Sequence, residues 1–183
     1  MPQGDINARN MESGFSLVEL IIALLVSMIV IIGAATILVN SWLTQQDVTS
    51  TTEATTRGQL MGSTIERAMR NAKGFQLTPS DDSAIELRVW TSLGGNRTCQ
   101  AFQLDVGQAR IASSTSTLPD PSSWGDWEVG VQRQGTSPFF RRIGATTVEY
   151  TFQLETTSAP VPFSGEAKMR TIVDPGETSP CWP

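Results

Sequence analysis

Histidine is absent from this 183-residue chain. Its absence removes the commonest general base, the commonest metal ligand and the usual pH switch of proteins. No paired catalytic carboxylates, nucleophile motif or metal-ligand cluster takes its place in the sequence, so we expect no enzymatic activity, no cofactor and no metal. Two acidic groups come nearest to a calcium site, but their spacing misses that of an EF-hand loop. These groups are Asp81 with Asp82, and Asp120 with Asp126 and Glu128.

Positive charge is also scarce. The chain has 13 Lys and Arg side chains against 18 Asp and Glu, and its formal net charge is -5. This balance excludes a general nucleic-acid binder, which carries a strong basic excess. Arg67, Arg70 and Lys73 form a small basic strip at three-residue steps. A solvated helix face is the default interpretation of the strip, and a contact with DNA or an acidic partner is the alternative.

The chain has two cysteines, Cys99 and Cys181, without the close spacing of a zinc or redox motif. If this region lies outside the cytoplasm, a disulfide between them is the natural interpretation. Otherwise they are two ordinary thiols. The C-terminal half of the chain also contains Trp124, Trp127 and Trp182. Packing in the core is the favoured role of these tryptophans, and a patch that binds a sugar or a solid surface is the alternative.

Charge is missing altogether from Leu20 to Val39, a run of twenty mostly apolar residues. At about 1.5 Å per residue a helix of this length crosses the roughly 30 Å hydrocarbon core of a bilayer. The run is too long for the apolar core of a secretory signal peptide. Arg9 precedes it, and Arg57 is the first cation that follows. The positive-inside rule therefore favours a cytoplasmic N-terminus and an exported C-terminal region.

One carboxylate, Glu19, stands at the start of this apolar run. An ionisable group inside a membrane segment costs on the order of 2.5–3.5 kcal/mol on insertion scales, so it usually has a partner of opposite charge. The alternative is that Glu19 extends to the membrane interface and needs no partner.

The stretch GFSLVEL, residues 14–20, followed by an uninterrupted apolar helix, closely resembles the processing signal of type IV pilins and pseudopilins. The resemblance implies that a prepilin peptidase cuts between Gly14 and Phe15 and that Phe15 becomes N-methylated. It also implies that Glu19 attracts the charged N-terminal amine of a neighbouring subunit. The physics agrees, because cleavage places a cation on Phe15 one helical turn from Glu19. Two features depart from the family pattern: the leader contains Asp5 and Glu12, and no proline kinks the helix.

The resemblance and the residue pattern together predict four segments: a leader at 1–14, a transmembrane and assembly helix at 15–43, an amphipathic helix at 44–74 and an extracytoplasmic β-rich domain at 75–183. The helical pattern rests on an apolar stripe that ends before Gly74, a candidate C-cap. The stripe consists of Leu60, Met61, Ile65, Ala68, Met69 and Ala72.

Beyond Phe75 the period of the apolar residues changes from helical to twofold, which predicts strands and an α+β fold with the long helix on an antiparallel sheet. The predicted strands are Ile85–Trp90, Ala101–Val106, Ala109–Ile111 after a turn at Gly107, Val148–Leu154 and, more weakly, Glu128–Gln132 and Met169–Val173. In pilins a disulfide often staples the C-terminal region, so the resemblance implies that Cys99 and Cys181 are paired.

The expected function is that of a structural subunit of a bacterial type IV pilus, with a minor subunit favoured over the main shaft subunit. A pseudopilin of a type II secretion system is the alternative, as is a tip or competence pilin that binds DNA or a surface. The expected partners are the prepilin peptidase, other pilin subunits, the inner-membrane assembly platform and the lipid bilayer, with nucleic acid as a weaker candidate. The expected location is the inner membrane first and a filament afterwards.

Overall fold

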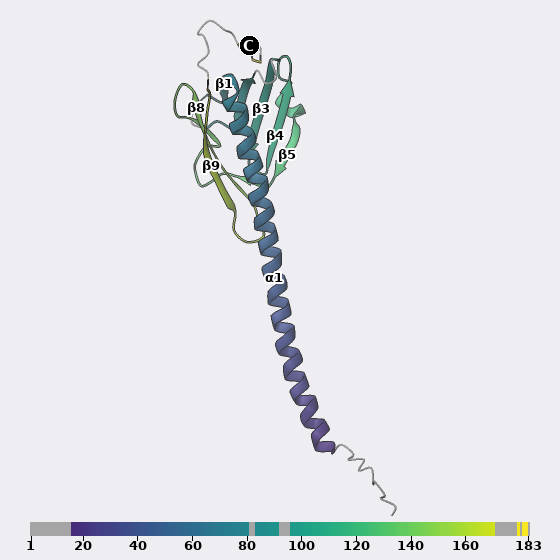
Figure 1. Ribbon diagram of the computed structural model, residues 1–183. Helices are drawn as coiled ribbons and strands as arrows, with labels where there is room; N and C mark the ends of the chain where they lie inside the picture. The colour runs from purple at the N-terminus through teal and green to yellow at the C-terminus, as the bar shows by residue number, and fades with distance from the viewer. Residues whose placement is uncertain (1–15, 81–82, 92–95, 171–178, 180, 183) are drawn as a thin grey trace, which may run out of the picture. The chain divides into compact units, whose positions relative to one another are not determined.

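The computed structural model describes residues 16–80, 83–91, 96–170, 179 and 181–182. The chain divides into two compact units, Met1–Gln45 and Gln46–Pro183. One helix, α1 (Leu17–Arg70), begins in the first unit and ends in the second (Figure 1). The predicted leader, residues 1–14, and Phe15 lie outside the described residues.

Helix α1 is continuous over 54 residues because nothing in its sequence interrupts it. No proline occurs in it, and its threonine hydroxyls donate to backbone carbonyls four residues earlier, which satisfies these polar groups within the helix. These threonines are Thr36, Thr44, Thr52, Thr55, Thr56 and Thr64, with donor–acceptor distances of 2.7–2.9 Å. The threonine-rich stretch therefore stays helical.

Helix α1 ends at Arg70, and the expectation that Gly74 caps it is wrong. The Asn71 N–H donates to the carbonyls of Arg67 at 3.3 Å and Ala68 at 3.2 Å, which closes the last turn. Strand pairing then takes over at once, so that Gly74 lies inside the first strand, opposite Trp90. Residues 72–74 form a strand and not a further helical turn because they pair with a neighbouring strand. A local sequence pattern does not reveal such pairing.

Five antiparallel strands form the first sheet, in the order in which they occur in the chain. They are β1 (Ala72–Thr78), β2 (Glu86–Thr91), β3 (Thr98–Asp105), β4 (Gln108–Ser114) and β5 (Gly125–Val129). Between β3 and β4 the chain turns through Val106 and Gly107, and Gly107 has φ +95°. The turn was predicted at Gly107 and Gln108, so it is confirmed for Gly107, while Gln108 is already the first residue of β4. A short 3₁₀ helix, η2 (Pro121–Ser123), precedes β5.

A second antiparallel sheet is built around β8 (Thr147–Leu154). Strands β6 (Val131–Gln132) and β7 (Phe140–Arg142) pair with β8, as does β9 (Val161–Lys168). The predicted strand Glu128–Gln132 is split at Gly130, which has φ +72° and separates β5 of one sheet from β6 of the other. The predicted strand Met169–Val173 is wrong for Met169 and Arg170, which follow β9; residues 171–173 lie outside the described residues.

The main core lies where the second half of α1 meets both sheets. The predicted apolar stripe is buried at Met61, Ile65, Ala68 and Met69, while Leu60 is 61% exposed. The stripe packs with buried side chains of both sheets, among them Leu87, Val89, Phe102, Leu104, Phe152 and Leu154. The predicted α+β class, a long N-terminal helix on an antiparallel sheet, is confirmed.

Candidate processing and assembly segment

The first described residues form the start of helix α1. The Leu20 N–H donates to the Ser16 carbonyl at 3.1 Å, so Ser16 stands immediately before the first helical residue, Leu17. Glu19 lies in the first turn, where a carboxylate is favoured by the unpaired N–H groups and the positive end of the helix dipole. Gly14 and Phe15, the predicted cleavage and methylation residues, lie outside the described residues.

Glu19 is exposed, and among the described residues no cation forms an ion pair with it. The chain has no other charged residue between Glu19 and Asp47. A partner for this carboxylate must therefore come from the residues before Ser16 or from another molecule.

The side chains that follow Glu19 form an apolar surface along the first part of α1. From Leu20 to Val39 the large apolar side chains are between 48 and 72% exposed. Burial of such a side chain is favourable by about 1.5–3 kcal/mol of free energy relative to exposure to water. Exposure of the whole stretch to water is therefore unfavourable by tens of kcal/mol. The helix is long and apolar enough to cross a membrane. An apolar helix of this length, opening on a carboxylate, is suited to a bilayer or to a bundle of similar helices.

The family comparison decides what this segment is. Residues 9–35 match the model of the prokaryotic N-terminal methylation motif. The chain carries a prepilin signal. The resemblance seen in GFSLVEL is thus confirmed for this segment, which is similar to the signal of type IV pilin and pseudopilin precursors. Neither a curated protein nor a solved structure matches the chain.

In this prepilin-type chain Cys99 and Cys181 form a disulfide, with their Cα atoms 5.5 Å apart. Both cysteines are buried in a second, smaller core that lies apart from the main one. This second core also contains Trp90, Ala101, Leu118 and Trp124, with Trp182 packed against it. The bridge therefore fastens a segment near Cys181 to the first sheet.

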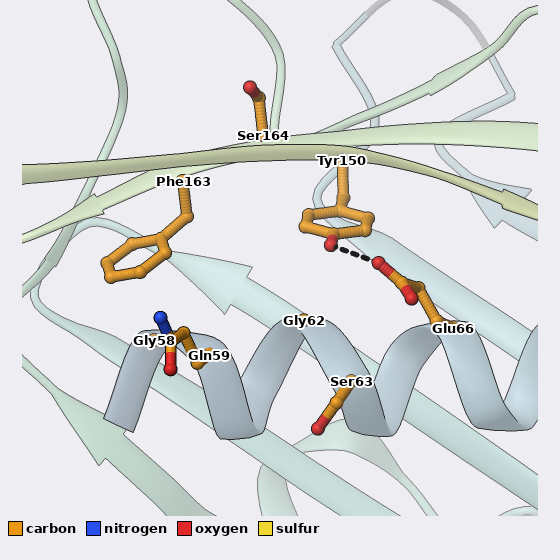
Figure 2. A pocket seen from close by; sticks show the side chains of 8 residues that line it. All are labelled: Gly58, Gln59, Gly62, Ser63, Glu66, Tyr150, Phe163 and Ser164. Atoms are coloured by element: carbon orange, nitrogen blue, oxygen red, sulfur yellow. Dashed lines mark hydrogen bonds between the residues drawn. The ribbon is translucent and has the colours of Figure 1, made fainter. Parts of the chain in front are cut away.

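A close contact between α1 and the second sheet was not predicted from the sequence. Gly58 and Gly62 of α1 face the rings of Phe163 and Tyr150 (Figure 2). Gly165 of β9 also lies against the Tyr150 ring. We call these three glycines the glycine slot. A Cβ at Gly58 would overlap the Phe163 ring, and a Cβ at Gly62 would lie 2.8 Å from the Tyr150 hydroxyl. The missing side chains let the strand approach the helix.

Tyr150 anchors this contact through its hydroxyl, which donates to Glu66 Oε1 at 2.7 Å (Figure 2). Burial raises the pKa of Tyr150 well above its usual value, and the hydrogen bond to the Glu66 carboxylate and its charge raise it further. The tyrosine is therefore neutral at physiological pH. The adjoining pocket, about 260 Å³, contains Gln59, Ser63 and Ser164 as further polar lining residues. The lining offers no activated nucleophile, and a structural role for this site fits its residues.

The remaining candidate residues do not form one site. Asp120 accepts from the Ser122 N–H at 2.9 Å and from its hydroxyl, and these hydrogen bonds lower its pKa. Asp126 lies 3.8 Å from Arg110, and Glu128 pairs with Arg57 at 2.8 Å. Among the described residues no group of three acidic or sulfur ligands could hold a metal, and Asp81 and Asp82 lie outside that part.

The tryptophans are also divided between the two cores. Trp127 packs against Phe102 of the main core, with 5.5 Å between ring centroids. Trp124 and Trp182 belong to the second core, where the Trp124 indole N–H donates to the Pro119 carbonyl at 2.9 Å. Packing is therefore the role that these contacts support, and a common surface patch is not.

Proposed function

We propose that the chain is a structural subunit of a bacterial type IV pilus, released from its leader by cleavage between Gly14 and Phe15 and methylated at Phe15. The observation that carries the proposal is a prepilin signal followed directly by an exposed apolar helix. In this proposal residues 15–43 form the membrane and assembly helix, and the β-rich region is exported. A minor role in the filament, favoured by the absence of a helix proline, belongs to the same proposal.

Glu19 has a specific role in this proposal: it pairs with the new N-terminal amine of a neighbouring subunit. The exposed carboxylate, without a cation among the described residues, supports this role. In a membrane or helix bundle the two opposite charges would relieve each other's desolvation, whereas each alone would be costly. The pairing thus favours the assembled state over the isolated subunit.

A pseudopilin of a type II secretion system is the second candidate, since the methylation motif is common to both classes. The two candidates share the processing step and differ in the filament that the subunit enters. Isolation of the subunit with surface pili or with a periplasmic secretion filament distinguishes them.

Mass spectrometry of the chain from its native membrane tests the processing step. We expect a mature chain that begins at N-methylated Phe15. Translation could begin at Met1 or at Met11. A chain that keeps either methionine as its first residue would contradict the proposal.

Replacement of Glu19 tests the pairing. We expect Glu19→Ala and Glu19→Gln to be cleaved at Gly14 but to enter filaments at least about tenfold less well, because an uncompensated amine costs a few kcal/mol in an apolar bundle. Cleavage is measured by mass spectrometry and incorporation by quantifying the subunit in sheared filaments. Glu19→Asp keeps the charge and is expected to retain part of the incorporation. Full incorporation of Glu19→Gln would refute the pairing.

A further inference from the structure

The unit Gln46–Pro183 has two ends that are defined by helix α1. The helix enters the unit at Gln46, at what we call the entry end, and stops at Arg70, at what we call the exit end. At 1.5 Å per residue, these ends lie about 35 Å apart along the helix. The charged side chains of the unit are distributed unequally between them.

The entry end is acidic. Asp47 and Glu53 come from α1, and Thr157, near the end of β8, donates its N–H to Ser50 Oγ of α1 at 3.0 Å. The Glu155 N–H donates to the Gly130 carbonyl, and the Gly130 N–H to the Gly107 carbonyl, both at 2.9 Å, so that three turns are joined here. These bonds and the pairing of β4 with β5 gather six carboxylates with two cations, Arg57 and Arg110, among the described residues. The carboxylates are Asp47, Glu53, Asp105, Asp126, Glu128 and Glu155.

The exit end is basic. Arg67 and Arg70 are exposed on the last turn of α1, and Lys73 follows on β1. The strand register places Ala72 beside Thr91, and Thr91 beside Thr98, which brings Arg97 to the same end of the first sheet. The guanidinium of Arg97 and the ammonium of Lys73 both lie over the Trp90 ring, at 5.7 and 5.6 Å from its centroid.

The second sheet adds four more cations to the exit end. Tyr150 contacts Glu66 on α1 and pairs with Gly165, while Phe163 contacts Gly58 earlier in the helix. Strand β9 therefore runs from the Gly58 level of the helix towards its last turn, and Lys168 and then Arg170 lie beyond Gly165 in that direction. The register also brings β7 and β8 to this level, because Arg141 pairs with Glu149 and Glu149 with Glu166. In the described part of the chain this end holds eight cations and three carboxylates. The cations are Arg67, Arg70, Lys73, Arg97, Arg141, Arg142, Lys168 and Arg170, and the carboxylates are Glu66, Glu149 and Glu166.

We propose that the exit end of one subunit docks head to tail on the entry end of a second copy of this chain. The proposal rests on the filament role proposed above and names the partner of this surface. It requires that the filament contain copies of this chain next to each other, which a minor role allows as long as the subunit occurs more than once per filament. A head-to-tail contact uses two different patches and produces a filament when it does not close into a ring. Opposite charges at the two ends steer the copies into one orientation and disfavour contacts between like ends. A polyanion such as DNA would be attracted by one end but repelled by the other.

Zero-length cross-linking with a carbodiimide tests the proposal on the unmodified chain. Both lysines of the chain, Lys73 and Lys168, belong to the exit end. We expect carbodiimide treatment of filaments to link them to Glu53, Glu155 or Asp47, as mapped by mass spectrometry. Within one copy these groups lie at opposite ends of the unit, and Glu53 is about 25 Å from Arg70 along the helix. A zero-length link therefore joins two copies. The yield should fall in 1 M salt, where the Debye length is about 3 Å.

Charge reversal supplies a second test with a built-in control. We expect Arg67→Glu with Arg70→Glu to lower filament incorporation about tenfold, because like charges then face each other across the contact. Glu53→Arg with Glu155→Arg should have a similar effect. A chain that carries all four changes exchanges the signs at these four positions, so the side chains that face each other there are opposite in charge again and incorporation should recover. Recovery also shows that the variants fold.

Three outcomes would overturn the proposal. If the two lysines are cross-linked only to another protein, the partner of the exit end is that protein and not a second copy. This result is expected of a subunit that occurs once per filament. If both double variants enter filaments as well as the wild-type chain, the charges at the two ends do not contribute to docking. Loss of DNA retention in the exit-end variant without recovery in the four-residue variant would point to nucleic acid. Failure of the filament role itself is recognised separately, because Phe15 would then not be the mature N-terminus.

Discussion

At the scale of single residues, Tyr150 is informative because the chain has no other tyrosine. Its ring lies against Gly62 and Gly165, and its hydroxyl donates to Glu66. The twofold pattern around Tyr150 correctly predicted a strand with this side chain facing the core. The glycines that make room for it could not be recognised, because in a helix Gly58 and Gly62 look only like weak points costing about 1 kcal/mol each. Their purpose depends on rings that are about 90–100 residues away in the sequence.

The single tyrosine permits a direct titration. Burial and the Glu66 carboxylate raise the pKa of Tyr150 above its usual value near 10. In the detergent-solubilised folded chain, tyrosinate absorbance near 295 nm should therefore remain absent at pH values where the urea-unfolded chain already shows it.

This pKa difference has a consequence for stability. Above about pH 10 the unfolded state releases its proton first, so the folded state binds more protons and the free energy of unfolding falls as pH rises. In Tyr150→Phe the free energy of unfolding should therefore decrease less above about pH 10 than in the wild-type chain. A folded chain that titrates like the unfolded one would contradict the Tyr150–Glu66 contact.

The glycine slot makes a second prediction at this scale. Gly58→Ala gains helix propensity but forces a methyl group into the Phe163 ring, and overpacking of this kind costs about 1–3 kcal/mol. We expect a lower urea midpoint for the unit Gln46–Pro183. Gly33→Ala is the matched control, because a Cβ there meets nothing within 4 Å in the chain. Equal midpoints for the two variants would show that the slot is not tight.

At the scale of elements, the best-predicted strands are those in which apolar and polar side chains alternate most regularly. Thr147–Leu154 and Thr98–Asp105 have alternating burial along most of their length, and the sequence shows it. Strand β9 was missed because Pro162 and Gly165 are unfavourable in strands; β9 pairs with β8 alone among the described strands, and proline is tolerated in an edge strand. Strand β7 has three residues, too few for a periodic pattern.

Gly130 is the residue on which the division into two sheets depends. It joins β5 to β6 with φ +72°, a left-handed conformation that costs other residues about 1–2 kcal/mol. Gly130→Ala should therefore destabilise the β-rich unit by about that amount in urea unfolding. Gly125→Ala is the matched control: φ at Gly125 is not positive, and an added Cβ comes no closer than 3.8 Å to the Ile111 carbonyl oxygen. A larger loss at Gly125 than at Gly130 would refute this account.

At the scale of the whole molecule, the chain combines a helix segment without a core of its own and a unit that has two cores. The change from helical to twofold periodicity predicted the α+β class, with a long N-terminal helix on an antiparallel sheet. The second core could not be predicted, because Trp90, Leu118 and Cys181 come from distant parts of the sequence. Only the first sheet and the disulfide bring them together.

The disulfide should matter for the stability of this unit. A bridge across 82 residues contributes about 4–5 kcal/mol on the chain-entropy model. We expect Cys99→Ala with Cys181→Ala to lower the free energy of unfolding by up to that amount and to change tryptophan fluorescence, since three tryptophans contact the second core. Reduction of the wild-type chain with dithiothreitol serves as the control. Identical urea midpoints for the oxidised and reduced chains would contradict this role.

The glycine slot also links positions that must change together during evolution. A larger side chain at position 58 would require a smaller one at position 163, and the same holds for position 62 with position 150. Gly58→Ala combined with Phe163→Leu should be tolerated better than the first change alone. Relatives that have drifted from this sequence would then be recognised by compensating pairs across the helix and the sheet.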